Sequence, residues 1–276
     1  MFFNPFVFPT LILGAACYWA GRRSIAAVGD DEPARRRRLL LLALLSLPGF
    51  SFIFYYAHLV REPAWYVEGR SIPGVEMLSA LSGLIFGALE IRKPLAGKWR
   101  HVISPWTMFR ISILAVFIPF AKPILLPLTR GGLHETWKDG VCIQSTAATC
   151  GPCSLATVFK SLGLEATERE IARNAFSGKT GTENWYLIRY ARRHGLDAKI
   201  GYTTDLKSVK PPAILGVKLE GGAGHFITYL GDQDRRRIIG DPLSGRFLLT
   251  DEVFHQLYDY AGMAIEFKAA GTSVPP

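Results

Sequence analysis

The first 130 residues contain four long stretches in which almost every position is apolar, at 2–19, 39–60, 72–89 and 111–128. A helix needs about 20 mostly apolar residues to cross a bilayer, so the first two stretches are good spans and the last two are marginal. The third stretch contains Glu76 and glycines, and the fourth contains Lys122 and three prolines. The pattern predicts a transmembrane helical region over residues 1–130 with about four spans.

Residues 131–276 have the shorter periodicities of a folded α+β domain. The apolar positions between Ser154 and Gly163 recur at helical spacing and predict a helix that begins at about Thr149 to Pro152, since proline is tolerated in the first turn. Short apolar stretches separated by glycine and charged turns predict strands at 212–217, 225–230 and 237–240. This order, with a helix first and a sheet second, predicts helices packed on an antiparallel sheet.

Two further helices are predicted before the strands. Residues Thr167 to Glu170 form a capping box, and the residues from Trp185 onward form a helix that ends at Gly195. Aromatic residues at this spacing usually belong to a core. Trp185 could equally line a substrate groove, because the glycine-rich loop 177–184 precedes it.

Four residues of the second half have the types and the order of a cysteine nucleophile site: Gln144, Cys150, His225 and Asp241. A thiol attacks an acyl carbon only as the thiolate, so Cys150 needs an imidazole to hold its proton, and the imidazole needs an acceptor that fixes its tautomer. His225 and Asp241 can fill these two roles, and the helix N-terminus at Cys150 favours the thiolate. The side-chain amide of Gln144, six positions earlier, can join the Cys150 backbone N–H as a donor to the oxyanion.

Each of these residues also has an ordinary explanation. Cysteine is often a small buried hydrophobe, and a histidine in a strand is often a hydrogen-bonded core residue. His134 is a weaker rival to His225, because it is the other imidazole close in sequence to the nucleophile helix. The four residue types occur together, in order and in the local contexts that the chemistry requires, which favours a papain-like site.

With these motifs, residues from about Gly140 to Phe267 resemble the cysteine peptidases of family 39, the bacteriocin-processing domains that in some exporters remove double-glycine leader peptides. The resemblance implies a papain-like fold, with Gln144 as oxyanion-hole donor, Cys150 as nucleophile, His225 as general base and acid, and Asp241 as the residue that orients His225.

Two positions depart from the family pattern. Thr149 stands where many exporter-linked members carry an acidic residue, and Cys153 stands where alanine is common. Both departures indicate a divergent, stand-alone branch. No glycine-rich phosphate loop follows a strand in the sequence, so ATP binding is not expected and the chain is not expected to be a complete exporter.

The basic excess of the chain lies in its first half. The formal net charge is +9, and residues 1–130 carry 15 Lys and Arg against 7 Asp and Glu. Most of these basic residues lie in two segments, 22–38 and 92–110, each between two apolar stretches. Cytoplasmic loops hold an excess of Lys and Arg, so both segments are assigned to the cytoplasm. The block Arg35 to Arg38 is expected to face anionic lipid head groups rather than nucleic acid, because it lies within one loop length of two spans.

These charges also predict the side of the membrane on which the C-terminal domain lies. With four spans, both termini lie outside, and the domain faces the periplasm or the exterior of a prokaryotic cell. No positive charge precedes Arg22, so the first stretch is expected to be a retained anchor and not a cleaved signal. If the proline-broken fourth stretch does not span, the domain faces the cytoplasm instead. The outside placement is favoured, because Arg110 flanks the fourth stretch and the polar linker 129–140 follows it at once.

The cysteines and histidines do not indicate a metal site or a disulfide framework. Four cysteines are too few to define such a framework, and no spacing is that of a metal site, so neither a metal nor another cofactor is expected. Cys142 and Cys153 could pair with each other or compete for Cys150 in an oxidising compartment. Both are expected to stay reduced, because Cys153 falls one helical turn after Cys150 and is expected to point into the core.

Together these features predict a multi-pass membrane protein whose cysteine peptidase domain hydrolyses peptide bonds through an acyl-thioester, on small secreted or leader peptides. The expected partners are a peptide or protein substrate, the lipid bilayer and an exporter, and nucleic acid is not expected. An acyltransferase could use the same site and pass the acyl group to an amine or a thiol. A catalytically silent peptide-binding module is a third alternative, against which the presence of all four catalytic residue types argues.

Overall fold

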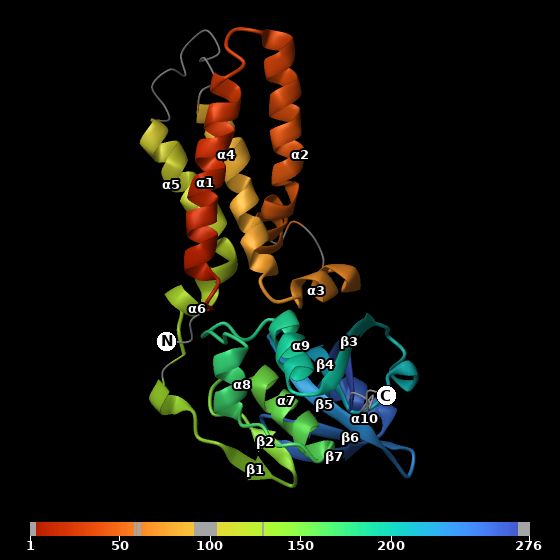
Figure 1. The fold of residues 1–276 in the computed structure, drawn as a ribbon. Helices are drawn as coiled ribbons and strands as arrows, with labels where there is room; N and C mark the ends of the chain where they lie inside the picture. Colours follow the sequence, from red (N-terminus) through yellow and green to blue (C-terminus); the bar gives the residue numbers. More distant parts are fainter. Residues whose placement is uncertain (1–3, 58, 60–61, 91–103, 129, 270–276) are drawn as a thin grey trace, which may run out of the picture. The chain divides into compact units, whose positions relative to one another are not determined.

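The computed structural model of the chain describes residues 4–57, 59, 62–90, 104–128 and 130–269 (Figure 1). The predicted cytoplasmic residues Arg92, Lys93, Lys98 and Arg100 lie outside the described residues. The chain divides into two compact units. The first, called here the helical unit, contains 4–62 and 73–121, and the second, called the sheet unit, contains 63–72 and the chain from Lys122 onward.

Among the described helices of the helical unit, the longest begins at a side-chain cap. The Asp31 side chain accepts a hydrogen bond from the Ala34 N–H at 3.1 Å and so begins the long second helix. The elements of this unit are α1 (Val7–Ala26), α2 (Glu32–Tyr56), the 3-10 helix η1 (Val75–Leu81), α4 (Ser82–Glu90), α5 (Pro105–Phe117) and the 3-10 helix η2 (Ile118–Phe120). The short helix α6 (Ala121–Leu125) continues the last of these into the sheet unit.

Among the described residues, two helices are long and apolar enough to cross a membrane: α2, and the continuous run Pro105–Leu125. A third is added only if the bent pair Ala64–Arg70 and Val75–Glu90 counts as one span. These helices indicate that the chain associates with a membrane.

Close packing between α1 and α4 explains the glycines of the third apolar stretch. A Cβ atom on Gly21 would lie 1.9 Å from the carbonyl oxygen of Leu84, and a Cβ atom on Gly87 would lie 1.9 Å from that of Tyr18. The two backbones therefore meet where there are no side chains, as at helix interfaces within membranes. These glycines weaken the apolar signal of the sequence because they serve the contact with α1.

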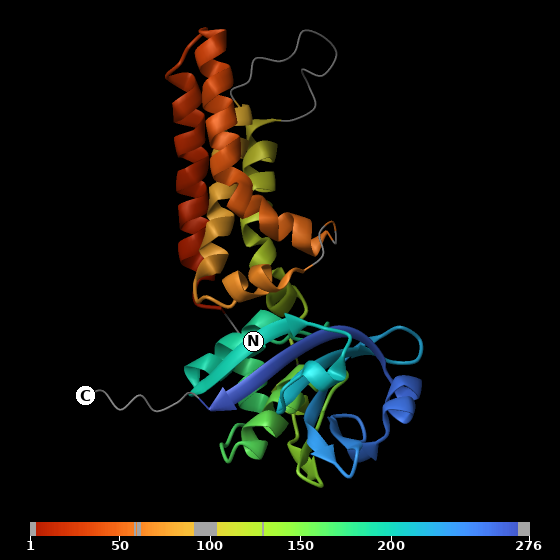
Figure 2. The ribbon, with the colours of Figure 1, turned by 90° about the vertical axis from the view of Figure 1, so that its right-hand side faces the viewer.

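In the described part of the sheet unit, six strands form one antiparallel sheet, in the order β3-β8-β4-β5-β6-β7. Figure 2 shows β3 and β8 side by side along one edge. The strands are β3 (Leu196–Tyr202), β4 (Ala213–Lys218), β5 (Gly224–Gln233), β6 (Arg236–Asp241), β7 (Gly245–Leu249) and β8 (Asp259–Ala269). A separate hairpin joins β1 (Thr136–Lys138) to β2 (Val141–Ile143).

The helices α7 (Cys150–Ser161), α9 (Asn184–Arg193) and α10 (Asp251–Leu257) pack against this sheet. The helix α8 (Glu168–Asn174) packs against α7 and α9, and 3-10 turns lie at η3 (Arg130–Gly132) and η4 (Leu206–Ser208). The helix α7 contacts β4, β5 and β6 and lies across the middle of the sheet. The predicted α+β class is confirmed, as are the predicted nucleophile helix, which is α7, and the three predicted strands, which are β4, β5 and β6. The prediction did not include β3, β7 and β8.

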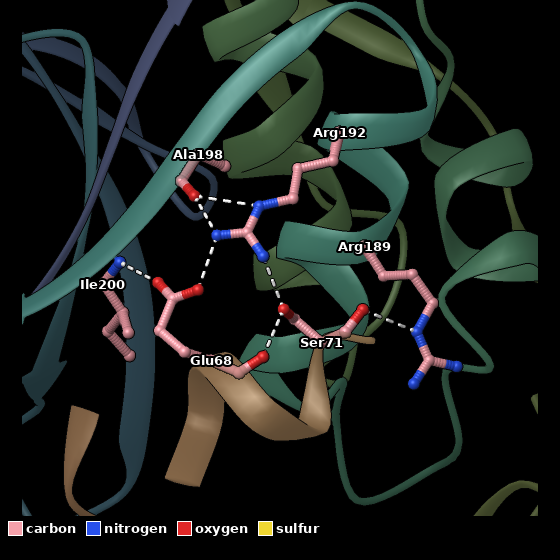
Figure 3. Close-up of polar contacts among 6 residues, drawn as sticks. All are labelled: Glu68, Ser71, Arg189, Arg192, Ala198 and Ile200. Atoms are coloured by element: carbon pink, nitrogen blue, oxygen red, sulfur yellow. Dashed lines mark hydrogen bonds and ion pairs between the residues drawn. The ribbon is translucent and has the colours of Figure 1, made fainter. Parts of the chain in front are cut away.

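The segment Pro63–Ile72, called here the strap, follows the candidate span α2 in sequence and yet belongs to the sheet unit. Its helix α3 (Ala64–Arg70) contacts α9 and β3. The guanidinium of Arg189, which is 3% exposed, donates to the carbonyl oxygens of Arg70 at 2.7 Å and Ile72 at 2.9 Å. It also donates to the carbonyl oxygen of Ser71 at 3.2 Å (Figure 3). These carbonyls lie at the C-terminus of α3, where intrahelical donors are lacking and a positive charge is favourable.

The strap also covers the open edge of the sheet. Because β3 is an edge strand, alternate N–H and C=O groups point away from β8 and need other partners. Glu68 accepts a hydrogen bond from the Ile200 N–H at 3.2 Å, and Arg192 donates to the Ala198 carbonyl oxygen at 2.6 and 3.1 Å (Figure 3). Arg192 and Glu68 are themselves joined at 2.6 Å. The strap is therefore held by charged groups that also satisfy the strand edge.

Trp185, which could have lined a substrate groove, belongs instead to the core of the sheet unit. The side chain is fully buried, and the guanidinium of Arg70 lies 4.2 Å from the centroid of its ring. The positive charge of Arg70 is attracted to the face of the indole ring, and this attraction stabilises the packing of the strap on Trp185. The groove hypothesis for Trp185 is wrong, because the strap covers this position.

Replacing Arg189 by methionine is expected to lower the free energy of unfolding by about 2–4 kcal/mol, because three carbonyls at the end of α3, two of them in buried bonds, lose a charged donor. The measurement is the unfolding of the detergent-solubilised full chain, together with the rate of trypsin cleavage after Arg70, which should rise. Arg193→Met is the matched control, since Arg193 is an exposed arginine on the same helix. Equal behaviour of the two variants would contradict a stabilising role for the bonds to the strap.

Candidate active site

Cys150 is the first residue of α7, with Thr149 as the residue before the helix. The side chain is almost buried, with 8% of the residue exposed. Gly151 allows the first turn of α7 to approach its neighbours, because a Cβ atom there would lie 3.1 Å from Leu187 Cδ1 and 3.2 Å from Phe226 Cδ2. The thiol is thus held at a helix N-terminus that faces β5, where the helix dipole favours a negative charge.

A turn before the helix is fixed by Thr149 and Glu168. The Thr149 hydroxyl accepts from the Thr146 N–H at 3.1 Å and donates to the Thr146 carbonyl at 3.0 Å. The fully buried Glu168 accepts from the Ser145 N–H at 2.9 Å and from the Ser145 hydroxyl at 2.5 Å. The Thr149 hydroxyl therefore closes this turn, and Glu168 holds Ser145 within it. Glu168 is a positioning residue that the capping box alone did not reveal.

His225 lies at the beginning of β5, between Cys150 and Asp241. Its Nε2 bonds to Asp241 Oδ1 at 2.8 Å, and its side chain also forms a hydrogen bond with Cys150. Burial lowers the pKa of His225, but the bonds to Asp241 and Cys150 outweigh it and raise that pKa to about 9. The imidazole is therefore arranged to hold a proton between the thiol and the carboxylate.

Asp241, at the end of β6, is held by three donors. They are His225, the Leu243 N–H at 2.8 Å from Oδ1, and the Tyr258 hydroxyl at 2.8 Å from Oδ2. Burial raises the pKa of Asp241, but these hydrogen bonds lower it by more than burial raises it, so the net shift of the pKa is downward. Tyr258 was not predicted as a site residue. It lies 17 residues beyond Asp241, just after α10, and nothing in its local sequence indicates this contact.

Gln144 follows β2 and is tied to the end of β6. Its N–H donates to the Pro242 carbonyl at 2.9 Å, and its side-chain Nε2 donates to the Thr146 carbonyl at 2.9 Å. A carboxamide has two N–H groups, so one is left after the bond to Thr146. The buried Oε1 has no hydrogen-bond partner among the described residues. Gln144 thus lies in the same loop as Cys150, with its backbone bonded next to Asp241.

Of the two imidazoles considered, the structure brings His225 to Cys150. The His134 N–H bonds to the Ser145 hydroxyl, and the residue is exposed in the segment before β1. No group of three or more His, Cys, Asp and Glu side chains within the described residues is arranged to hold a metal ion.

Residues 138–271 match the model of the peptidase C39 family. A protein of unassigned function from Methanothermobacter thermautotrophicus is 31% identical over 126 residues, which cover 46% of this chain and 87% of that protein. A second, from Methanothermobacter marburgensis, is 29% identical over 123 residues, covering 45% and 85%.

Solved structures to which this chain is similar include peptidase domains of transporters. The peptidase domain of Streptococcus ComA, a bi-functional ABC transporter involved in quorum sensing, is 23% identical, with a TM-score of 0.41 and coverage of 46% of this chain and 96% of that one. A double glycine motif protease from an AMS/PCAT transporter, in complex with the leader peptide, is 23% identical, with a TM-score of 0.41 and coverage of 51% and 96%. The match to the family model shows that the chain, through residues 138–271, belongs to the peptidase C39 family and is a cysteine peptidase.

Proposed function

We propose that this chain is a membrane-anchored peptidase in which Cys150 attacks the peptide carbonyl and forms an acyl-thioester. The observation that carries the proposal is the hydrogen-bonded series Cys150, His225 and Asp241, which lies within the residues that match the family. Since Nε2 of His225 is bonded to Asp241, Nδ1 is the nitrogen left for the thiol. The proton of Cys150 passes to this nitrogen as the sulfur becomes the thiolate.

The reaction then follows two acyl-transfer steps. The thiolate forms a C–S bond to the carbonyl carbon, and as the C–N bond breaks, the imidazolium gives its proton to the leaving amine. Neutral His225 next takes a proton from water, the resulting oxygen nucleophile attacks the thioester, and the C–S bond breaks to release the acid. The Cys150 N–H and the second N–H of the Gln144 side chain are assigned to the oxyanion in both steps.

The proposed substrates are small secreted or leader peptides, and an exporter is the proposed partner. Family membership supports the substrate class, because the bacteriocin-processing domains that this chain resembles remove leader peptides. Transfer of the acyl group to an amine uses the same intermediate. It is distinguished by the product formed when an amine acceptor is present.

The proposed four-span topology places the peptidase domain outside the cytoplasm, and the strap supports this. The candidate span α2 carries the block Arg35 to Arg38 in its first turns, and the chain that follows its other end becomes the strap, which is bonded to α9 and β3. The run Pro105–Leu125 likewise leads into the sheet unit, where Lys122 pairs with Glu183 at 2.6 Å. If the arginine-rich ends are cytoplasmic, both spans deliver the domain to the opposite side.

Labelling of intact cells with a membrane-impermeant thiol electrophile tests the proposed site and its side together. We expect fast modification of Cys150, located by peptide mass spectrometry, that is lost in Cys150→Ser and slowed in His225→Ala, because the imidazole maintains the thiolate. Labelling only after lysis would place the domain in the cytoplasm and overturn the outside assignment. Slow labelling that does not depend on His225 would overturn the catalytic assignment and favour a silent peptide-binding module.

A further inference from the structure

Two buried cysteines outside the catalytic series lie next to each other. The sulfur atoms of Cys142, on β2, and Cys153, on α7, are 3.1 Å apart, and both residues are fully buried and free in the structure. A disulfide requires an S–S distance of about 2 Å, so the two sulfurs need to approach by about 1 Å.

The backbones that carry these cysteines are already fixed relative to each other. The Thr157 hydroxyl accepts from the Cys142 N–H at 3.0 Å and donates to the Cys153 carbonyl oxygen at 2.9 Å. One side chain of α7 thus ties together the two residues whose sulfurs meet. A disulfide forms only where the backbones bring the two sulfurs together, and here the backbone contacts through Thr157 accompany sulfurs that lie 3.1 Å apart.

Cys150 is directed elsewhere. Its side chain bonds to His225 on β5, whereas the sulfur of Cys153, one turn later, faces Cys142 on β2. A bond between Cys142 and Cys153 therefore leaves the nucleophile free. It closes a loop from 142 to 153 that contains Gln144 and Cys150.

We propose that Cys142 and Cys153 are a redox site, at which a disulfide-bearing thiol oxidant converts the two thiols into one intramolecular disulfide that joins β2 to α7. One thiolate attacks the disulfide of the oxidant, which gives a mixed disulfide and releases one thiol. The second cysteine then displaces the other half of the oxidant. The pair loses two electrons and two protons, and the oxidant becomes two thiols. This replaces the expectation that both cysteines stay reduced.

The environment of the pair sets when the bond forms. Burial raises the pKa of Cys153, and the neighbouring Cys142 thiol and Glu168 raise it further, so the folded thiol reacts slowly with an external oxidant. The bond is therefore made while the domain folds or opens locally. Once made, the disulfide restricts the conformations that the loop carrying Gln144 and Cys150 can adopt in the unfolded chain. This restriction stabilises the folded domain.

Equilibration of the purified full chain with a mixture of oxidised and reduced glutathione tests the site directly. The variant used carries Cys17→Ser and Cys150→Ser, so that the pair provides the remaining thiols. After equilibration, acid quenching, denaturation and alkylation, mass spectrometry is expected to find a direct Cys142–Cys153 link in most molecules. Adding Cys142→Ala is the matched control, and Cys153 should then carry glutathione or the alkylating group. Recovery of both cysteines as separate glutathione adducts or alkylated thiols overturns the proposal.

A second measurement uses the parent chain with Cys150 intact. Oxidation is expected to raise the midpoint of thermal unfolding by about 5–10 °C, reversed by a dithiol reductant, with peptidase activity within a few-fold of that of the reduced form. An unchanged midpoint would overturn the stabilising role. Acid trapping of the thiols in whole cells tests the side of the membrane separately from the redox site. If the pair forms a disulfide in glutathione but is reduced in cells, the result supports the redox site and contradicts the outside placement of the domain.

Discussion

Replacing Cys150 by alanine is expected to lower kcat/KM for peptide hydrolysis by at least about 10³-fold, because without the sulfur no acyl-thioester can form. The substrate is a set of synthetic leader-like peptides with two glycines before the scissile bond, and the products are identified by mass spectrometry. An accompanying reaction with an added amine distinguishes hydrolysis from acyl transfer, since a transferase gives the amide product and a hydrolase gives the free acid.

Cys153→Ala is the matched control for this loss. It removes a second thiol of the same helix, one turn from the first, and its sulfur takes no part in the series from Cys150 to Asp241. We expect this variant to keep activity within a few-fold of that of the parent. Retained turnover in Cys150→Ala, or an equal loss in both variants, would contradict the assignment of Cys150 as nucleophile.

Replacing Asp241 by asparagine is expected to reduce the peptidase rate by about 10- to 100-fold and to move the alkaline limit of activity to lower pH. Asparagine has nearly the same shape, and its oxygen can still accept from His225 and the Leu243 N–H, which both bond Oδ1 in the parent. Its amide group then faces the Tyr258 hydroxyl, which can turn to accept. The change therefore removes mainly the negative charge beside His225.

The direction of the pH effect follows from the raised pKa of His225, about 9. The imidazolium is needed to protonate the leaving amine, so activity should fall as the pH rises through about 9 in the parent. The charged form of His225 also stabilises the fold. This contribution is fully present below the unfolded pKa of about 6.5 and is lost as the pH rises through about 9. Without the Asp241 charge, both changes should begin about one pH unit lower or more.

Tyr258→Phe distinguishes the effect of the Asp241 charge from the effect of the position of its carboxylate. It removes the hydroxyl that donates to Oδ2 at 2.8 Å and keeps the carboxylate and its bond to His225. We expect a few-fold loss of activity and an alkaline limit close to that of the parent. An alkaline limit that is the same in Asp241→Asn and in the parent would contradict the proposed role of the Asp241 charge.

The sequence predicted those helices and strands of the sheet unit whose apolar residues recur at a regular spacing next to a candidate catalytic residue. The apolar positions after Cys150 recur at helical spacing and indicate α7, whose residues from Cys150 to Phe159 are all buried. The strands β4, β5 and β6 are apolar enough to stand out between glycine turns. The strand β8 did not stand out, since its small residues Ala261, Gly262 and Ala264 give a weak alternating signal. Its length and its place between β3 and β4 come from pairing with both neighbours.

The sequence by itself determined the order Gln144, Cys150, His225 and Asp241, the apolar stretches and the concentration of basic residues in the first half, because these depend on residue type and local spacing. Only the tertiary structure decided the contacts between distant segments: Tyr258 on Asp241, Glu168 on the loop before Cys150, and Cys142 against Cys153. It also decided that the strap, a short loop between apolar stretches, binds α9 and the edge of β3. Such contacts join residues whose separation along the chain carries no periodic signal, so hydrogen bonds and burial in the folded state are what specify them.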